Sequence, residues 1–224
     1  MKGLKYLVVL LFIASCSCAQ QREERNLPEF RGLGINGNFT VTLVKSKTSK
    51  VLVESSAPLD KIVTEVNNGI LNISLKKNSF SGGKITIYYV NNLESISLNG
   101  SAEVRGMDLM DPENLEVSVR GSGDIFLNAL KVKQLSASVA GSGDIKLKGS
   151  SEQADFSVAG SGDINAFDFE TVNANISIAG SGDVTANVTG NINVTIAGSG
   201  DVIYKGNPKV GKVSIAGSGS FVKQ

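Results

Sequence analysis

The 224-residue sequence contains no histidine and no tryptophan, and its only cysteines are Cys16 and Cys18. Without histidine, the Ser–His and Cys–His nucleophile systems cannot be assembled, and zinc sites built on histidine or cysteine are excluded from the folded part. A domain beyond residue 18 has no disulfide, so it depends on buried apolar surface and hydrogen bonds. Of the common catalytic groups, only carboxylates remain.

Charge and aromatic content argue against nucleic-acid binding. The chain has 22 basic and 21 acidic residues, and aromatic residues make up 6% of it. No basic stripe with interleaved aromatic side chains is present, which is the usual footprint of a nucleic-acid surface. We therefore expect no nucleic-acid partner.

The N-terminus resembles an export signal. A basic start at Met1–Lys5 precedes a short apolar run at Tyr6–Ala14, which is too brief to span a membrane. Small residues follow, as in a secretory signal peptide, which we place at residues 1–19. The polar residues 20–29 are interpreted as a tether.

Two processing sites remain open at the end of this signal. The segment Ile13–Cys16 resembles a bacterial lipobox, in which Cys16 would be acylated and become the mature N-terminus. The segment Ser17–Ala19 resembles an ordinary cleavage site ahead of Gln20. Both alternatives predict an exported protein, and only the first predicts a lipid anchor.

One tetrapeptide recurs through the second half of the chain. Gly-Ser-Gly-Asp stands at Gly121–Asp124, Gly141–Asp144, Gly160–Asp163, Gly180–Asp183 and Gly198–Asp201, with Gly100–Glu103 as a looser first copy and Gly217–Ser220 as the last. Successive copies are 18 to 21 residues apart. A fixed period near twenty is typical of a solenoid, in which each unit buries its apolar face against its neighbours.

The residues around the tetrapeptide predict the type of solenoid. Apolar and polar residues alternate on both sides, as in Leu115–Val119 and Ile125–Leu127, and β-branched residues dominate. The fold class is therefore all-β: a right-handed parallel β-helix with coils of about 20 residues and a tetrapeptide at each corner. Whether a coil holds two strands or three stays open.

We interpret residues 30–224 as one domain. Its repeat coils occupy residues 94–224, and an irregular β part at residues 30–93 precedes them. Within that part, Asn67–Gly69 predicts a hairpin turn, because asparagine and glycine accept positive φ.

Three stretches resemble a known family. Residues Phe30–Leu43, Leu59–Ile73 and Leu93–Ala102, together with the repeated corners, are similar to the DUF2807 family, which carries the label putative auto-transporter adhesin, head GIN domain. The resemblance covers nearly all of residues 27–224. It implies a β-helical, exported protein of the kind common in Bacteroidota envelopes, and it supplies no catalytic residues.

The corner carboxylates are the main candidate site: Asp124, Asp144, Asp163, Asp183 and Asp201. Stacking places them in one column about 5 Å apart. We expect a structural role in which each carboxylate accepts hydrogen bonds from turn N–H groups. The alternatives are a ladder of calcium sites and an acid pair acting on carbohydrate. We predict no cofactor and no catalytic residue.

Outward-facing small residues form two further columns. One contains Ser118, Ser138, Ser157, Ser177, Thr195 and Ser214, and the other contains Ala140, Ala159, Ala179, Ala197 and Ala216. Steric fit explains such columns, and they also offer a flat contact face. The functional hypothesis is a non-enzymatic module of the outer membrane, cell surface or periplasm that contacts a protein or glycan through these faces.

The alternative function is a carbohydrate-binding or carbohydrate-active β-helix that uses the corner aspartates. Membrane contact is expected only through the possible lipid anchor at Cys16. The C-terminal segment Ser218–Gln224 either closes the last coil or joins two rods end to end, so a homo-oligomer is possible.

Overall fold

The computed structural model describes residues 21–56, 58–76 and 82–224. The expected signal peptide and Cys16 lie outside these residues. The described chain forms seventeen strands and one short 3₁₀ turn. In chain order the elements are β1 (Gln21–Asn26), β2 (Gly32–Gly37), β3 (Thr40–Lys45), β4 (Lys50–Ser55), η1 (Leu59–Lys61), β5 (Ile62–Asn67), β6 (Ile70–Leu75), β7 (Lys84–Tyr89), β8 (Ser95–Gly100), β9 (Glu103–Gly106), β10 (Asn114–Gly121), β11 (Asp124–Gly141), β12 (Ile145–Gly160), β13 (Ile164–Gly180), β14 (Val184–Gly198), β15 (Val202–Lys205), β16 (Lys209–Gly217) and β17 (Phe221–Lys223).

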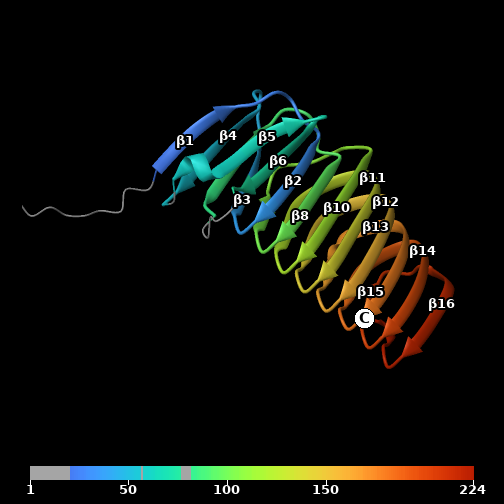
Figure 1. Cartoon of the computed structure of the whole chain (residues 1–224). Helices are drawn as coiled ribbons and strands as arrows, with labels where there is room; N and C mark the ends of the chain where they lie inside the picture. The colour runs from blue at the N-terminus through green and yellow to red at the C-terminus, as the bar shows by residue number, and fades with distance from the viewer. Residues whose placement is uncertain (1–20, 57, 77–81) are drawn as a thin grey trace, which may run out of the picture.

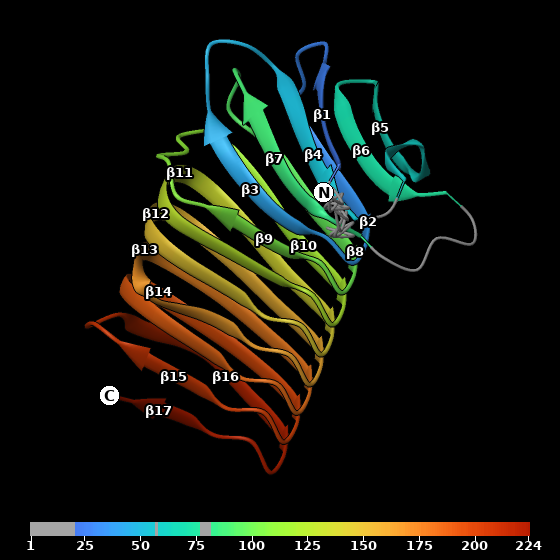
Figure 2. The ribbon, with the colours of Figure 1, turned by 90° about the vertical axis from the view of Figure 1, so that its left-hand side faces the viewer.

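The strands wind into a rod of stacked coils, as the sequence predicts (Figure 1). Each coil has a sharp corner at its tetrapeptide, and the corners line one side of the stack (Figure 2). We call the strands that run into the corner the incoming face: β2, β8, β10, the second halves of β11 to β14, and β16. The strands that leave it form the outgoing face: β3, β9, the first parts of β11 to β14, β15 and β17.

Each coil has two long faces and, opposite the corner, a short segment that pairs separately with its counterparts, as Glu170–Thr171 does with Asn187–Val188. From β11 to β14, one long strand runs from corner to corner and bends midway, where the pairing register shifts, as between Leu127 and Leu130. Such irregularities bend a strand without ending it. A coil therefore has one sharp corner and, between its two long faces, a short segment set off by register shifts.

All equivalent strands in successive coils pair in parallel, and the tetrapeptides stay in register. Gly121 pairs with Gly141, and the same alignment repeats through Gly160, Gly180 and Gly198. Parallel, in-register stacking puts identical side chains one above another. It is this register that turns a repeat in sequence into columns in space.

The core is a set of apolar columns inside the rod. One column on the incoming face contains Val119, Val139, Val158, Ile178 and Ile196, which are each about 1% exposed. Another on the outgoing face contains Ile125, Ile145, Ile164, Val184 and Val202, which are fully buried. Each residue is covered by its counterparts in the coils on either side, so no coil has a complete core alone.

The solenoid begins earlier than the repeat in the sequence indicates. Strands β2 and β3 form a coil that stacks on β8 and β9, with Gly37 paired to Gly100. Gly37 has φ 135° and Gly100 has φ 120°, so both corners use the same left-handed backbone. Part of the segment that we expected to be irregular is therefore regular. The chain forms this coil first. Strands β6 and β7 come later in the chain and pair with β2 and β3 on the side away from β8 and β9.

Antiparallel strands finish the N-terminal end. Strand β5 pairs with β6, β4 pairs with β7, and β1 pairs with β4. The β5–β6 connection turns at Asn68 and Gly69, with φ 51° and 76°, which confirms the hairpin. Residues 21–26, expected as part of the tether, instead form β1, because this charged strand finds an open edge at β4.

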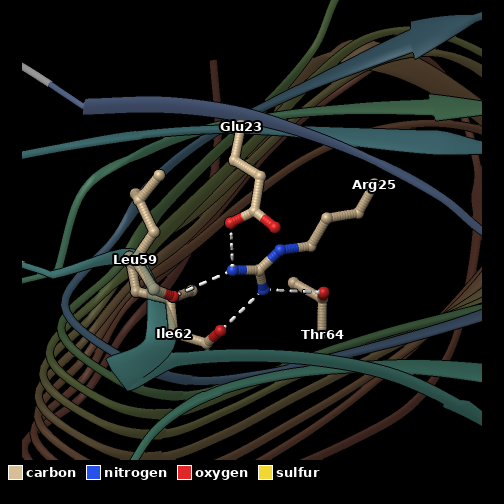
Figure 3. Close-up of polar contacts among 5 residues, drawn as sticks. All are labelled: Glu23, Arg25, Leu59, Ile62 and Thr64. Atoms are coloured by element: carbon tan, nitrogen blue, oxygen red, sulfur yellow. Dashed lines mark hydrogen bonds and ion pairs between the residues drawn. The ribbon is translucent and has the colours of Figure 1, made fainter.

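The guanidinium of Arg25 ties β1 to the opposite face (Figure 3). It donates to the carbonyl oxygens of Ile62 at 2.6 Å and Leu59 at 2.8 Å, and to the hydroxyl of Thr64 at 3.0 Å. Glu23 accepts a fourth bond at 2.8 Å, and this bond lowers the pKa of the Glu23 carboxyl. One side chain thus closes the end of the rod by linking β1 to η1 and β5.

No helix within the described ranges has the length and apolar character needed to cross a membrane.

Candidate functional site: the corner aspartates and the incoming face

Glycine is required at each corner by close approach between coils. A Cβ atom on Gly160 would lie 2.3 Å from the carbonyl oxygen of Gly141, and Gly160 has φ 135°. That same carbonyl oxygen accepts the backbone N–H groups of Ser161 at 2.8 Å and Gly162 at 3.1 Å. A side chain at the first glycine would push the coils apart and break both bonds.

The corner aspartates form a hydrogen-bonded ladder along the rod. The Oδ1 atom of Asp124 accepts the backbone N–H of Asp144 at 2.9 Å, and Oδ1 of Asp144 accepts that of Asp163 at 3.0 Å. The series continues from Asp163 to Asp183 at 2.7 Å and from Asp183 to Asp201 at 2.7 Å. Each carboxylate therefore satisfies an N–H of the next coil, where the corner interrupts the normal strand ladder.

The two ends of this ladder differ from its middle and from each other. At the first, Asp124 donates its N–H to the carbonyl oxygen of Ala102 at 2.9 Å, and no carboxylate is involved. Glu103 turns instead to Arg105, and this bond lowers the pKa of the Glu103 carboxyl. At the last, the N–H and hydroxyl of Ser220 both donate to Asp201, at 2.7 and 2.8 Å. The final tetrapeptide ends in serine at a position where no described coil follows to be bonded.

The ladder supports a structural role for the corner aspartates, but the donors differ from those expected in one respect. The turn N–H groups are indeed the donors, but each comes from the next coil and not from the same turn, as an Asx turn would require. Across residues 21–56, 58–76 and 82–224, no three acidic, histidine or cysteine side chains come together in a group that could hold a metal ion. The five carboxylates share one bonding pattern, so no two stand apart as an acid–base pair.

The outward columns on the incoming face lie where the sequence places them. Ser138, Ser157, Ser177, Thr195 and Ser214 share one register position. Ser118 shares it too but is buried, and its hydroxyl donates to Ser97 at 3.1 Å. The alanine column beside it is exposed from Ala140 to Ala216.

A ladder of amide side chains runs next to the serine column. Asn193 donates to Oδ1 of Asn175 at 3.0 Å, and Asn175 donates to Oδ1 of Asp155 at 2.8 Å. One row further, Asn191 donates to Oδ1 of Asn173 at 2.7 Å. These bonds fix exposed side chains that would otherwise rotate freely, so the face presents ordered donors and acceptors.

A shallow hollow of about 370 Å³ follows these two columns. Its rim contains Asp155 and Asn175 from the amide ladder, and Ser157, Ser177 and Thr195 from the serine column. Small side chains leave the strands accessible there, and the polar groups are uncharged except for Asp155. The arrangement suits contact with another polar surface better than the binding of a small apolar molecule.

Sequence reasoning missed two parts of this picture. The amide ladder could have been found by aligning the coils on their glycines, since Asp155, Asn175 and Asn193 fall at one repeat position. The hydrogen bonds of Arg25, which we call the Arg25 clasp, have no comparable signal in the sequence. Two of their acceptors are backbone carbonyl groups more than thirty residues away.

The comparisons with known proteins agree with this architecture. Residues 29–208 match the model of the DUF2807 family, described as putative auto-transporter adhesin, head GIN domain. The match covers most of the chain, and the protein belongs to this family. A comparison with curated proteins finds no match.

Solved structures with the same fold come from Bacteroides and Parabacteroides. A putative adhesin from Bacteroides fragilis aligns with a TM-score of 0.85 at 24% identity, over 93% of this chain and 98% of that one. A putative lipid binding protein from Parabacteroides distasonis aligns with a TM-score of 0.72 at 28% identity, over 92% and 96%. A putative adhesin from Parabacteroides merdae aligns with a TM-score of 0.74 at 21% identity, over 92% and 96%.

Proposed function

We propose that the protein is a non-enzymatic binding module of the bacterial cell envelope, which contacts a protein or glycan through its incoming face. The observation that carries this proposal is the rigid, flat and polar surface formed by the serine column and the amide ladder. Its side chains are small or already held by hydrogen bonds, so binding costs little conformational entropy. Membership of a family described as putative auto-transporter adhesins supports the same function.

Export and anchoring form part of this proposal. The N-terminal sequence favours secretion, and Cys16 is the residue that would carry a lipid. Mass spectrometry of the mature protein distinguishes the two processing sites, since an acylated Cys16 and a free Gln20 differ in mass by the lipid and four residues. A mature chain that still begins at Met1 would contradict export.

A matched pair of substitutions on one strand tests the binding face. Ser177 and Asn165 are both exposed on β13, on the incoming and outgoing faces respectively. Binding of the labelled protein is measured on a glycan array and on a panel of immobilised surface proteins. Ser177→Arg should abolish the strongest signal, and Asn165→Arg should retain it. Loss of binding in both variants, or in neither, would contradict the assignment to the incoming face.

Chelator and product assays separate the remaining alternatives. The signal should persist in EDTA, since the ladder carboxylates already bond backbone N–H groups. Release of reducing sugar ends that Asp163→Asn removes would instead support the carbohydrate-active alternative.

A further inference from the structure

The C-terminal end of the rod has an open strand edge. Strand β16 pairs with β14 and β17 pairs with β15, and no other described strand lies against their outer sides. An open edge presents unpaired backbone N–H and C=O groups that can pair with another chain. At nine residues, Lys209–Gly217, β16 is long enough to accept such a strand.

The interior columns of the rod also end here without a cover. Val210, Val213 and Ile215 occupy the inward register of the preceding coil but are 44%, 39% and 41% exposed. Their counterparts Ile192, Val194 and Ile196 are at most 1% exposed. The end of the solenoid is therefore an apolar platform of the kind that each earlier coil covers with the next.

The charged side chains after Asp201 are all lysines, and the Asp201 carboxylate itself is bonded to Ser220. Residues 202–224 contain four lysines and no acidic residue, although the whole chain has 21 acidic residues. Lys209 and Lys212 belong to β16 itself and are exposed. Lysine on an edge strand disfavours pairing with a strand of like charge and favours an acidic one.

These charges argue against a second copy as the occupant. Two C-terminal ends meeting face to face would bring both sets of lysines together. The N-terminal end of another copy is a poor match, because its outer strand β1 carries Arg22 and Arg25 beside Glu23 and Glu24, and Arg25 already bonds the carbonyl oxygens of Ile62 and Leu59.

We propose that the outer edge of β16 binds an extended acidic segment of another protein as one further strand. Alternate apolar side chains of that segment would cover Val210, Val213 and Ile215, and its acidic side chains would lie beside Lys209 and Lys212. This is β-strand addition, in which backbone bonds supply affinity and alternate side chains supply specificity. Strand β17 is less suited, because it is short and Lys223 stands at an inward register position.

A synthetic peptide tests the proposal directly. The probe is a blocked, fluorescent ten-residue peptide of alternating valine and glutamate, and the control alternates valine and lysine. The acidic peptide should raise fluorescence anisotropy with the intact protein, and the basic peptide should not. Hydrogen exchange should show new protection in β16 and none in β1.

Two variants test whether the peptide binds at the β16 edge and whether the lysines select its charge. Ile215→Lys places a charge inside the platform and should abolish binding, and its hydrogen exchange elsewhere reports that the rod stays folded. The double variant Lys209→Glu with Lys212→Glu should weaken the acidic peptide by about tenfold or more and admit the basic one.

Three outcomes would overturn the proposal. The first is equal binding of both peptides, or binding of neither. The second is a dimer in light scattering that Ile215→Lys dissociates, which would make a second copy the occupant. The third is binding of anionic phosphatidylglycerol vesicles through the same lysines without protection of β16, which would make the end a membrane contact.

Discussion

The two ends of the rod solve the same problem in different ways. The N-terminal end leaves the repeat, adds three antiparallel strands and closes with the Arg25 clasp. The last described coil at the C-terminal end continues the repeat, and three of its inward-register residues are exposed. A coil at the end of a stack exposes the columns that a further coil would cover, and the last described coil does so at Val210, Val213 and Ile215.

The comparison shows that the burial of a residue depends more on the neighbouring coil than on its own coil. Ile196 and Ile215 occupy the same column, on the same face, one coil apart. The first is 1% exposed and the second 41%. Nearly the same local sequence therefore gives a core residue in one coil and a surface residue in the next.

The largest expected effect contrasts these two residues. Ile196→Ala should lower the free energy of unfolding by about 2 to 5 kcal/mol, because it leaves a cavity between two coils. Ile215→Ala should cost less than about 1 kcal/mol, since the site is already open to solvent. Chemical denaturation followed by circular dichroism measures both. Equal losses would mean that the C-terminal end is covered in solution.

The second prediction concerns the hydrogen bonds of Arg25 at the N-terminal end. Arg25→Ala should lower the free energy of unfolding by about 2 kcal/mol, because two backbone carbonyls lose a charged donor. Hydrogen exchange should rise in β1 and β5 and stay unchanged in β14 and β16. Arg22→Ala, at an exposed position of the same strand, is the matched control and should alter neither quantity. A uniform rise along the rod would contradict a local clasp.

The aspartate ladder gives a third, smaller contrast between the middle of the rod and its open end. Asp163→Ala should cost about 1 to 2 kcal/mol, because the N–H of Asp183 loses its acceptor. Asp163→Asn keeps an acceptor oxygen and should cost less. Asp201→Ala should leave the midpoint almost unchanged and raise hydrogen exchange mainly at Ser220 and β17. Equal effects of Ala and Asn at residue 163 would argue against the ladder.

Sequence reasoning performed best where one local rule repeats. The tetrapeptide requires glycine at every corner, and alternation marks which side chains face inward, so the coils, their register and the aspartate column followed from the residues alone. The first coil escaped notice because Gly37 is followed by Asn38 and Phe39, not by serine and glycine. Only the similarity of Ile35–Gly37 to Leu98–Gly100 marked it, and the intervening β6 and β7 hid the stacking order.

The N-terminal cap was less predictable for a physical reason. A strand such as Gln21–Asn26 has no apolar alternation, because an edge strand needs little burial and benefits from charge. Its sequence therefore resembles a tether. What makes it a strand is a partner edge at β4 and backbone acceptors around Arg25, and both are set by the three-dimensional fold.

The smallest expected effect belongs to Tyr89, on β7 next to the closed end. Its ring is fully buried, and its hydroxyl has no hydrogen-bond partner within the described part of the chain. Burial, together with the charges of Asp108 and Asp111, raises the pKa of Tyr89 to about 12 from an ordinary value of 10.0. A raised folded-state pKa means that this contribution to stability is complete below pH 10 and is lost as the pH rises toward 12.

Replacing Tyr89 by phenylalanine removes both the unpartnered hydroxyl and this titration. At pH 7, Tyr89→Phe should stabilise the fold by about 1 kcal/mol, because a buried polar group without a partner is eliminated. Between pH 10 and 12 the gain over the wild type should increase, because only in the wild type does unfolding expose a phenol that then ionises, and this ionisation favours the unfolded state. Denaturation curves of the two proteins across this range test the sign, and the lysines cancel in the difference. A constant difference would show that water reaches the hydroxyl, and the N-terminal end would then be less tightly closed than the Arg25 clasp implies.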